Sequence, residues 1–166
     1  ADAPEQQNTY FLENTGSNYR LTAYVPASDE KLTYSLSYDE SNVVKHYSDA
    51  SELYWQFIGD SWGVNTKQAL ITIVPPATLT KPQVKAWAHG PLNGLVNIEK
   101  NGNITLRVQD LPANTFVEAR ALYPSDTFSA APLIDGSITN TVLSEEKNWA
   151  GQANAERGAV RRHLYG

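Results

Sequence analysis

Hydrophobic and polar residues alternate with a period of two along several short stretches of the chain, a pattern typical of half-buried β-strands. The clearest alternation covers residues 32–38, where leucine and tyrosine take every second position and threonine or serine lies between them. Similar alternation, or runs rich in aromatic and β-branched residues, predict further strands at residues 20–25, 52–59, 68–74, 84–88 and 115–123.

A β-hairpin is the strongest local prediction. Val96 and Ile98 lie before the segment Lys-Asn-Gly-Asn at residues 100–103, and the alternation resumes at Ile104. An Asn-Gly pair tolerates the positive φ angles of a type I′ turn, whose twist matches that of the flanking strands. Short strands separated by turn residues, spaced by roughly 8–15 residues, predict an all-β fold, namely an antiparallel β-sandwich with a C-terminal α-helix.

The final segment carries the helical pattern. No proline interrupts it, Ser144 can cap a helix there, and glutamates near the start with arginines near the end complement the helix dipole. Trp149 lies on the apolar stripe, so we expect it to dock against the sheets, while the basic end frays. We therefore expect a β-sandwich domain at 1–142, with a flexible terminus at 1–8, and a C-terminal membrane-proximal helix at 143–166.

The composition excludes several classes of protein. The chain has 166 residues, of which 41% are hydrophobic, so it is long enough for one folded domain. It contains no cysteine, which excludes disulfides, cysteine nucleophiles and cysteine-based zinc sites. Its net charge of −5 argues against nucleic acid as a partner. It contains no run of about 18 apolar residues, the length that a membrane-spanning helix requires.

No catalytic motif emerges from the sequence. His46, His89 and His163 lie in different segments without metal-binding spacing, so we predict no metal site and no cofactor. His89 precedes a Gly-Pro pair, where a hydrogen bond within a turn is the favoured interpretation. Glu118 and Arg120 share one face of their predicted strand, and a structural ion pair is their simplest role. We therefore expect no enzymatic activity.

An aromatic cluster is the most specific feature of the chain. Its five members lie within sixteen positions: Tyr47, Tyr54, Trp55, Phe57 and Trp62. Alternate side chains of a strand can enter the core or stay at the surface, where Trp and Tyr rings stack on sugars or anchor a partner protein. The other interpretation, that these rings form the core and its edge, is the favoured one. The candidate binding residues are Tyr54, Trp55, Trp62 and Trp87.

A longer motif extends over residues 32–64. A strand with alternating tyrosines is followed by D-x-x-E-L-Y-W and then by G-x-x-W, at positions Tyr34, Leu36, Tyr38, Asp49, Glu52, Leu53, Tyr54, Trp55, Gly59 and Trp62. This motif resembles the extracytoplasmic β domain of predicted bacterial membrane proteins grouped as domain of unknown function family 2207. Weaker matches follow at residues 84–90, 111–112, 117–120 and 124–128.

The resemblance implies a location and a class of function. In that family the β region is followed by a helix and then by a membrane segment. We expect the chain to be a piece of a longer, membrane-anchored bacterial protein on the extracytoplasmic face, although the piece itself contains no span. The leading function is a non-enzymatic module that contacts an unknown protein or the cell envelope. The alternative is a carbohydrate-binding module that stacks surface Trp and Tyr rings on an envelope glycan.

Overall fold

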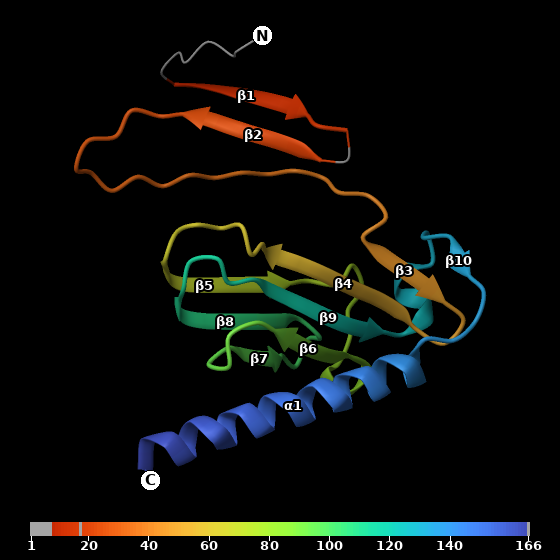
Figure 1. Cartoon of the computed structure of the whole chain (residues 1–166). Coiled ribbons are helices and arrows are strands. Elements are labelled where there is room, and N and C mark those ends of the chain that lie inside the picture. The colour runs from red at the N-terminus through yellow and green to blue at the C-terminus, as the bar shows by residue number, and fades with distance from the viewer. Residues whose placement is uncertain (1–7, 17, 166) are drawn as a thin grey trace. The chain divides into compact units, whose positions relative to one another are not determined.

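The computed structural model describes residues 8–16 and 18–165, with side chains up to residue 158 (Figure 1). Within these residues the chain is mostly β: ten strands form three sheets, and one α-helix follows near the C-terminus. The chain separates into two compact units, residues 1–39 and residues 40–166. The terminus predicted to be flexible, residues 1–8, lies outside the described residues apart from Asn8.

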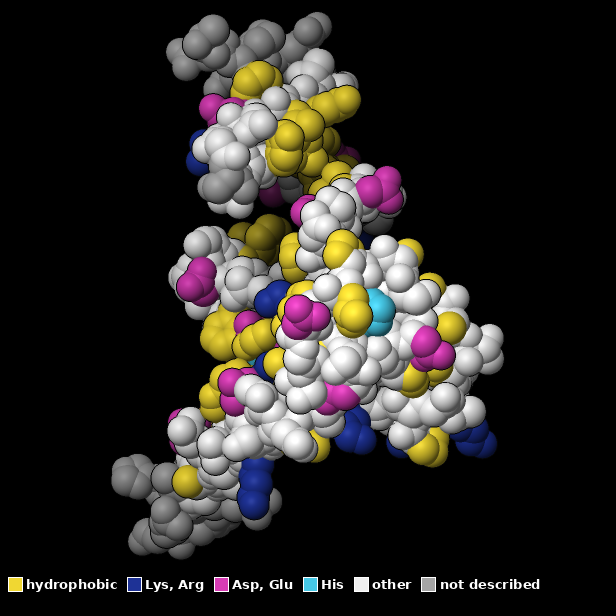
Figure 2. Space-filling model, turned by 90° about the vertical axis from the view of Figure 1, so that its right-hand side faces the viewer, with side chains coloured by type: hydrophobic (Ala, Val, Ile, Leu, Met, Phe, Trp, Pro, Cys, Tyr) yellow, Lys and Arg dark blue, Asp and Glu magenta, His cyan; other side chains and the backbone are white. Residues whose placement is uncertain are grey.

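The first unit contains one β-hairpin. Strands β1 (Thr9–Asn14) and β2 (Tyr19–Tyr24) pair antiparallel, and β2 confirms the strand predicted at residues 20–25. The register places one row of side chains on a single face of the hairpin: Tyr10, Leu12, Tyr19, Leu21 and Ala23. This apolar face is exposed in the unit, and hydrophobic side chains gather over the hairpin in Figure 2.

The segment at residues 32–38, predicted as the clearest strand, forms no strand. Tyr34, Leu36 and Tyr38 are 65%, 65% and 68% exposed. Alternation gives this segment two distinct faces, but a β-strand also requires a neighbouring strand that completes its backbone hydrogen bonds. None of the described strands pairs with it, so the prediction is wrong.

The second unit contains two larger sheets, with strand orders β10-β3-β4-β9-β6 and β5-β8-β7. The five-stranded sheet comprises β3 (Val44–Tyr47), β4 (Ser51–Ile58), β6 (Lys85–His89), β9 (Val117–Tyr123) and β10 (Leu133–Ile134). The three-stranded sheet comprises β5 (Thr66–Ile73), β7 (Leu95–Ile98) and β8 (Ile104–Leu111). The unit also contains two short 3-10 helices, η1 (Lys81–Gln83) and η2 (Ser125–Phe128). Four predicted strands are thereby confirmed as β4, β5, β6 and β9. The pairing is antiparallel except between β3 and β10, which run parallel.

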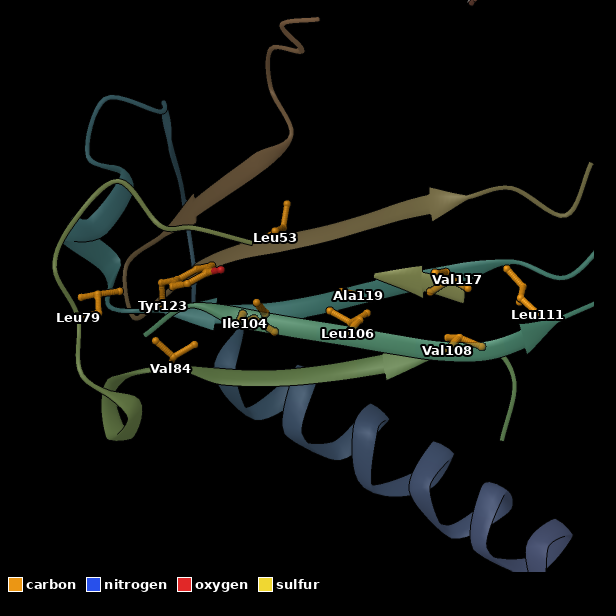
Figure 3. Close-up of a cluster of buried hydrophobic side chains, with 12 residues drawn as sticks. Leu53, Leu79, Val84, Ile104, Leu106, Val108, Leu111, Val117, Ala119 and Tyr123 are labelled. Carbon is orange, nitrogen blue, oxygen red and sulfur yellow. The ribbon is translucent and has the colours of Figure 1, made fainter. Parts of the chain in front are cut away.

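The core of the second unit draws on both of its sheets (Figure 3). Alternate side chains of β8 are buried, from Ile104 through Leu106 to Val108. Val117 and Tyr123 of β9 belong to the same cluster. Burying one Val, Leu or Ile side chain stabilises a fold by roughly 1.5–3 kcal/mol, so this shared core holds the two sheets together.

The predicted hairpin is present as β7 and β8, but its turn differs from the expected type I′. Glu99 N–H donates to Asn103 O at 2.8 Å, so three residues form the loop rather than two. Only Gly102 of this loop has a positive φ, at 82°. A Cβ on Gly102 would lie 2.7 Å from Leu79 Cβ, so close packing as well as backbone conformation requires glycine here.

Helix α1 (Thr139–Tyr165) begins before the predicted cap at Ser144. The carboxylate of Asp49 caps it instead, accepting from Ile138 N–H at 2.9 Å and from Thr139 N–H at 3.1 Å. Burial acts to raise the pKa of Asp49, but these hydrogen bonds outweigh it and lower the pKa. The basic end predicted to fray remains helical through Tyr165, and the side chain of its first arginine, Arg157, is described, whereas the side chains after residue 158 lie outside the described residues. No helix of the described part is long and apolar enough to cross a bilayer.

Candidate binding site

One face of the five-stranded sheet carries charged and aromatic residues and contacts α1. The strand register places Tyr54 of β4 and Trp87 of β6 on either side of Arg120 of β9. The next row along the strands holds Glu118 beside His89. Paired residues in a sheet point to the same side, so these side chains share one face. Hydrogen bonds from this face to α1 hold the helix against it.

A buried guanidinium lies at the centre of this face. Arg120 is 5% exposed, and its Nε donates to Glu52 Oε1 at 2.7 Å. Its Nη1 donates to Glu145 Oε2 at 2.6 Å and lies 3.5 Å from Glu146 Oε1. Burial acts to lower the pKa of Arg120, but hydrogen bonds to Glu145 and Glu52 raise it, so the cation is retained. Arg120 thus links β9 to both β4 and α1.

His89 forms a second link between the sheet and the helix. Its Nδ1 lies 2.9 Å from Glu118 Oε1, and its Nε2 lies 2.9 Å from Glu146 Oε2. Through these two carboxylates, His89 bridges β6, β9 and α1.

Aromatic rings surround these polar groups. Tyr54 OH donates to Glu118 Oε1 at 2.7 Å, and Arg120 Cζ lies 5.0 Å from the centre of the Tyr54 ring. Burial and the bond to Glu118 raise the pKa of Tyr54 above its usual range. The Trp149 ring packs edge-on against His89, with 4.6 Å between ring centres, which confirms its predicted docking. The Tyr54 and Trp149 rings thus pack around the bridge that His89 forms.

A groove of about 590 Å³ opens beside this network, between α1 and the edges of both larger sheets. Its floor is apolar and reaches the core at Leu106, Val108 and Val117. The wall along α1 includes two small residues, Ala150 and Ala153. Ligand sites typically have volumes of roughly 300–1,000 Å³, so the groove is a candidate binding site.

The structure separates the four predicted binding residues. Tyr54 and Trp87 both line the groove, and the partly buried Trp87 also packs on the cluster around Val142. Trp55 lies on the opposite face of β4 and packs against the core. Trp62 follows β4, is 52% exposed, and lies outside the groove, where its Nε1 donates to a threonine at 3.0 Å. These four rings therefore do not form one continuous surface.

Two predicted roles are wrong because partners distant in sequence compete with local ones. Glu118 and Arg120 do not pair with each other within the described residues: each bonds to other side chains. His89 bonds to two glutamates rather than within its turn. The sequence did contain a signal for long-range pairing, because Glu52 and Arg120 lie in otherwise apolar strands. Charged residues are almost never fully buried unless they are paired.

Metal binding finds no support in the described part of the chain, which contains no group of three His, Asp or Glu side chains able to hold an ion. His46 lies far from His89 in the sheet order and has its own partners, Ala131 O at 3.1 Å and Ser125 Oγ at 3.2 Å. The hydrogen bonds of Arg120 and His89 go to glutamate side chains of the same site.

Comparison with known proteins identifies one matching family model, described as the N-terminal domain of a predicted membrane protein (DUF2207). The match covers residues 2–123, which is more than half of the chain. No curated protein and no solved structure matches.

Proposed function

Because the chain belongs to the DUF2207 family of predicted membrane proteins, we propose that it is a non-enzymatic, extracytoplasmic binding module of a membrane-anchored bacterial protein. Its role is to contact another protein or a component of the cell envelope. The observation that carries this proposal is the groove beside α1, with a volume of about 590 Å³ and an apolar floor. Apolar surface gains free energy when it leaves water, so such a groove favours a binding role.

The chemistry of the groove favours binding over catalysis. His89 engages both Glu118 and Glu146, and Glu118 also accepts a hydrogen bond from Tyr54. Among the described residues that line the groove there is no serine, threonine or lysine that could act as a nucleophile. His89, Glu118 and Glu146 hold α1 on the sheet, and apolar side chains form the floor of the groove.

A β-sandwich is the fold that we propose for the second unit. Support comes from the buried cluster that the two larger sheets share, with Leu53 and Val117 from one sheet and Leu106 and Val108 from the other. In a sandwich, alternate residues of both sheets interdigitate to form such a core. The groove would then lie where the open edges of the two layers meet α1.

Photo-crosslinking in cells that express the full-length protein tests the binding role. A photoreactive phenylalanine analogue is placed at the exposed Gln152, which lines the groove, or at Asn148, which lies on α1 outside it. We expect a discrete adduct with another protein or an envelope component from position 152 and none from position 148. No adduct at 152, or equal adducts at both positions, would overturn the proposal.

The extracytoplasmic location has a separate test. These 166 residues contain no cysteine, so Lys147→Cys gives them one thiol, exposed on α1, and the unsubstituted protein is the labelling control. A membrane-impermeant maleimide should label this thiol in intact cells. Labelling that requires lysis would contradict the proposed side of the membrane.

Carbohydrate binding is the second candidate function, and a specific observation favours it. Four aromatic side chains line the groove together with carboxylates: Tyr54, Trp87, Phe116 and Trp149. Aromatic rings provide flat apolar faces for ligands such as sugars. A glycan array with the purified protein should then give binding that Trp149→Ala removes and that Trp62→Ala, outside the groove, retains. No binding by the unmodified protein would exclude this function.

A further inference from the structure

We infer that the groove binds an extended segment of a partner protein, which pairs with the free edge of β6 as an added strand. This inference rests on the proposed function and names the class of partner. In strand addition, backbone hydrogen bonds supply affinity, and pockets for alternate side chains supply specificity.

Both larger sheets end at the groove. Within the described residues, β6 pairs only with β9, and β7 pairs only with β8. The two edge strands lie near each other but share no backbone hydrogen bond. Their outer N–H and C=O groups are therefore available to a further strand.

The groove follows the edge of β6 itself. Ala86 and Ala88 lie on the core side of this strand, Trp87 and His89 lie on the side of α1, and all four line the groove. A space bordered by residues from both faces of one strand runs along the edge of that strand. Across the space α1 presents small alanine side chains, which leave room for a backbone.

The rest of the lining favours apolar side chains on the partner. Leu95 and Val96 of β7 are 68% and 39% exposed, and Phe116 is 37% exposed. An extended segment directs alternate side chains to the same side, so every second residue would face this apolar lining. We therefore expect apolar residues at alternating positions of the partner.

Charge complementarity adds a cationic residue to this description. Three carboxylates line the groove: Glu118, Glu146 and Glu156. Arg157 is the one arginine among the described lining residues, and its Nη2 donates to Leu92 O at 3.2 Å. Glu118 and Glu146 are already bonded to His89, so a Lys or Arg on the partner would pair with the exposed Glu156, whereas an acidic segment would be repelled by it.

The opposite edge of the five-stranded sheet is poorly suited to strand addition. β10 has only 2 residues, whereas β6 has 5. Very short edge strands are one way in which proteins prevent strand addition. Of the two edges of this sheet, the β6 edge is therefore the favoured one.

Selection of peptides from a displayed random library, with the purified protein as target, tests the inference. We expect enriched sequences with apolar residues at alternating positions and at least one Lys or Arg. Affinity for a selected synthetic peptide should fall at least about tenfold in Ala153→Arg, which fills the groove and adds a positive charge. Lys147→Gln, on α1 outside the groove, is the matched control and should bind with unchanged affinity.

Two further measurements keep the test independent of folding and specific to strand addition. Glu156→Lys changes an exposed residue and should also weaken a peptide that carries Lys or Arg about tenfold. Peptide binding should slow amide hydrogen exchange in β6, because new backbone hydrogen bonds form there.

Several results would overturn the inference. These are enriched peptides without alternation, binding that neither variant weakens, and binding that leaves hydrogen exchange in β6 unchanged. Self-association that Ala153→Arg abolishes would make a second copy the occupant. If position 152 gives a protein adduct in cells but no peptide is enriched, strand addition fails and the proposed function stands. If neither experiment detects a binder, both fail.

Discussion

Arg120→Met should strongly destabilise the protein, because it removes the cation from a buried network. Glu52 and Glu146 are 4% and 3% exposed, so the substitution leaves them without their guanidinium partner. Two unit charges about 4 Å apart attract by about 4 kcal/mol at an effective dielectric constant of about 20, and desolvation offsets part of this attraction. Removing one partner of a buried pair costs about 3–5 kcal/mol. Typical domains have unfolding free energies of about 5–15 kcal/mol, so this is a large share.

Urea unfolding, followed by circular dichroism, measures this loss. Lys67→Met is the matched control, since the Lys67–Asp110 pair lies on the exposed surface and its removal should leave the unfolding midpoint unchanged. The double variant Arg120→Met/Glu52→Leu should recover part of the loss, because it also removes one unpaired carboxylate. A loss below about 1 kcal/mol for Arg120→Met would refute the buried network, since only exposed pairs contribute so little.

Three further predictions follow from individual contacts. His89→Ala should lower the urea unfolding midpoint, because it leaves the partly buried Glu118 and the buried Glu146 without their ring partner; an unchanged midpoint would contradict a stabilising role for this bridge. Asp49→Ala should cost about 1 kcal/mol in urea unfolding, because α1 loses its cap. Since the folded pKa of Asp49 lies below its ordinary 3.8, this contribution is present above that value and disappears as the pH falls through the folded pKa, so the two proteins should converge in acid. Tyr123→Phe should not lower the thermal midpoint, because the buried hydroxyl of Tyr123 has no hydrogen-bond partner among the residues that the structure describes. In the unmodified protein, burial raises the pKa of this residue to about 12, so alkaline titration should show a late-ionising tyrosine.

The strands of the second unit could be predicted because their signals are local. Alternation and flanking turn residues identified β4, β5, β6 and β9, and the Asn-Gly pair identified the β7–β8 hairpin. The same reasoning is wrong at residues 32–38, where the alternation is strongest. A strand forms only when a neighbouring strand completes its backbone hydrogen bonds. The sequence of the segment alone does not show whether such a neighbouring strand exists.

Long-range contacts explain the remaining differences. Helix α1 begins before Ser144 because Asp49, far earlier in the chain, supplies its cap. The i, i+2 spacing of Glu118 and Arg120 placed them on one face, but their partners come from β4, β6 and α1. A local pattern indicates which face a side chain occupies, whereas the register of distant elements decides what it meets.

The sequence by itself determined the β-rich class, the C-terminal helix, the absence of cysteine chemistry and the family, since these depend on composition, short-range periodicity and a linear motif. Only the tertiary structure decided that Tyr54 and Trp87 flank Arg120 while Trp55 enters the core, and that β6 and β7 leave open edges beside α1. The physical reason is that strand pairing and helix docking join residues separated by tens of positions, and neither leaves a periodic trace in the chain.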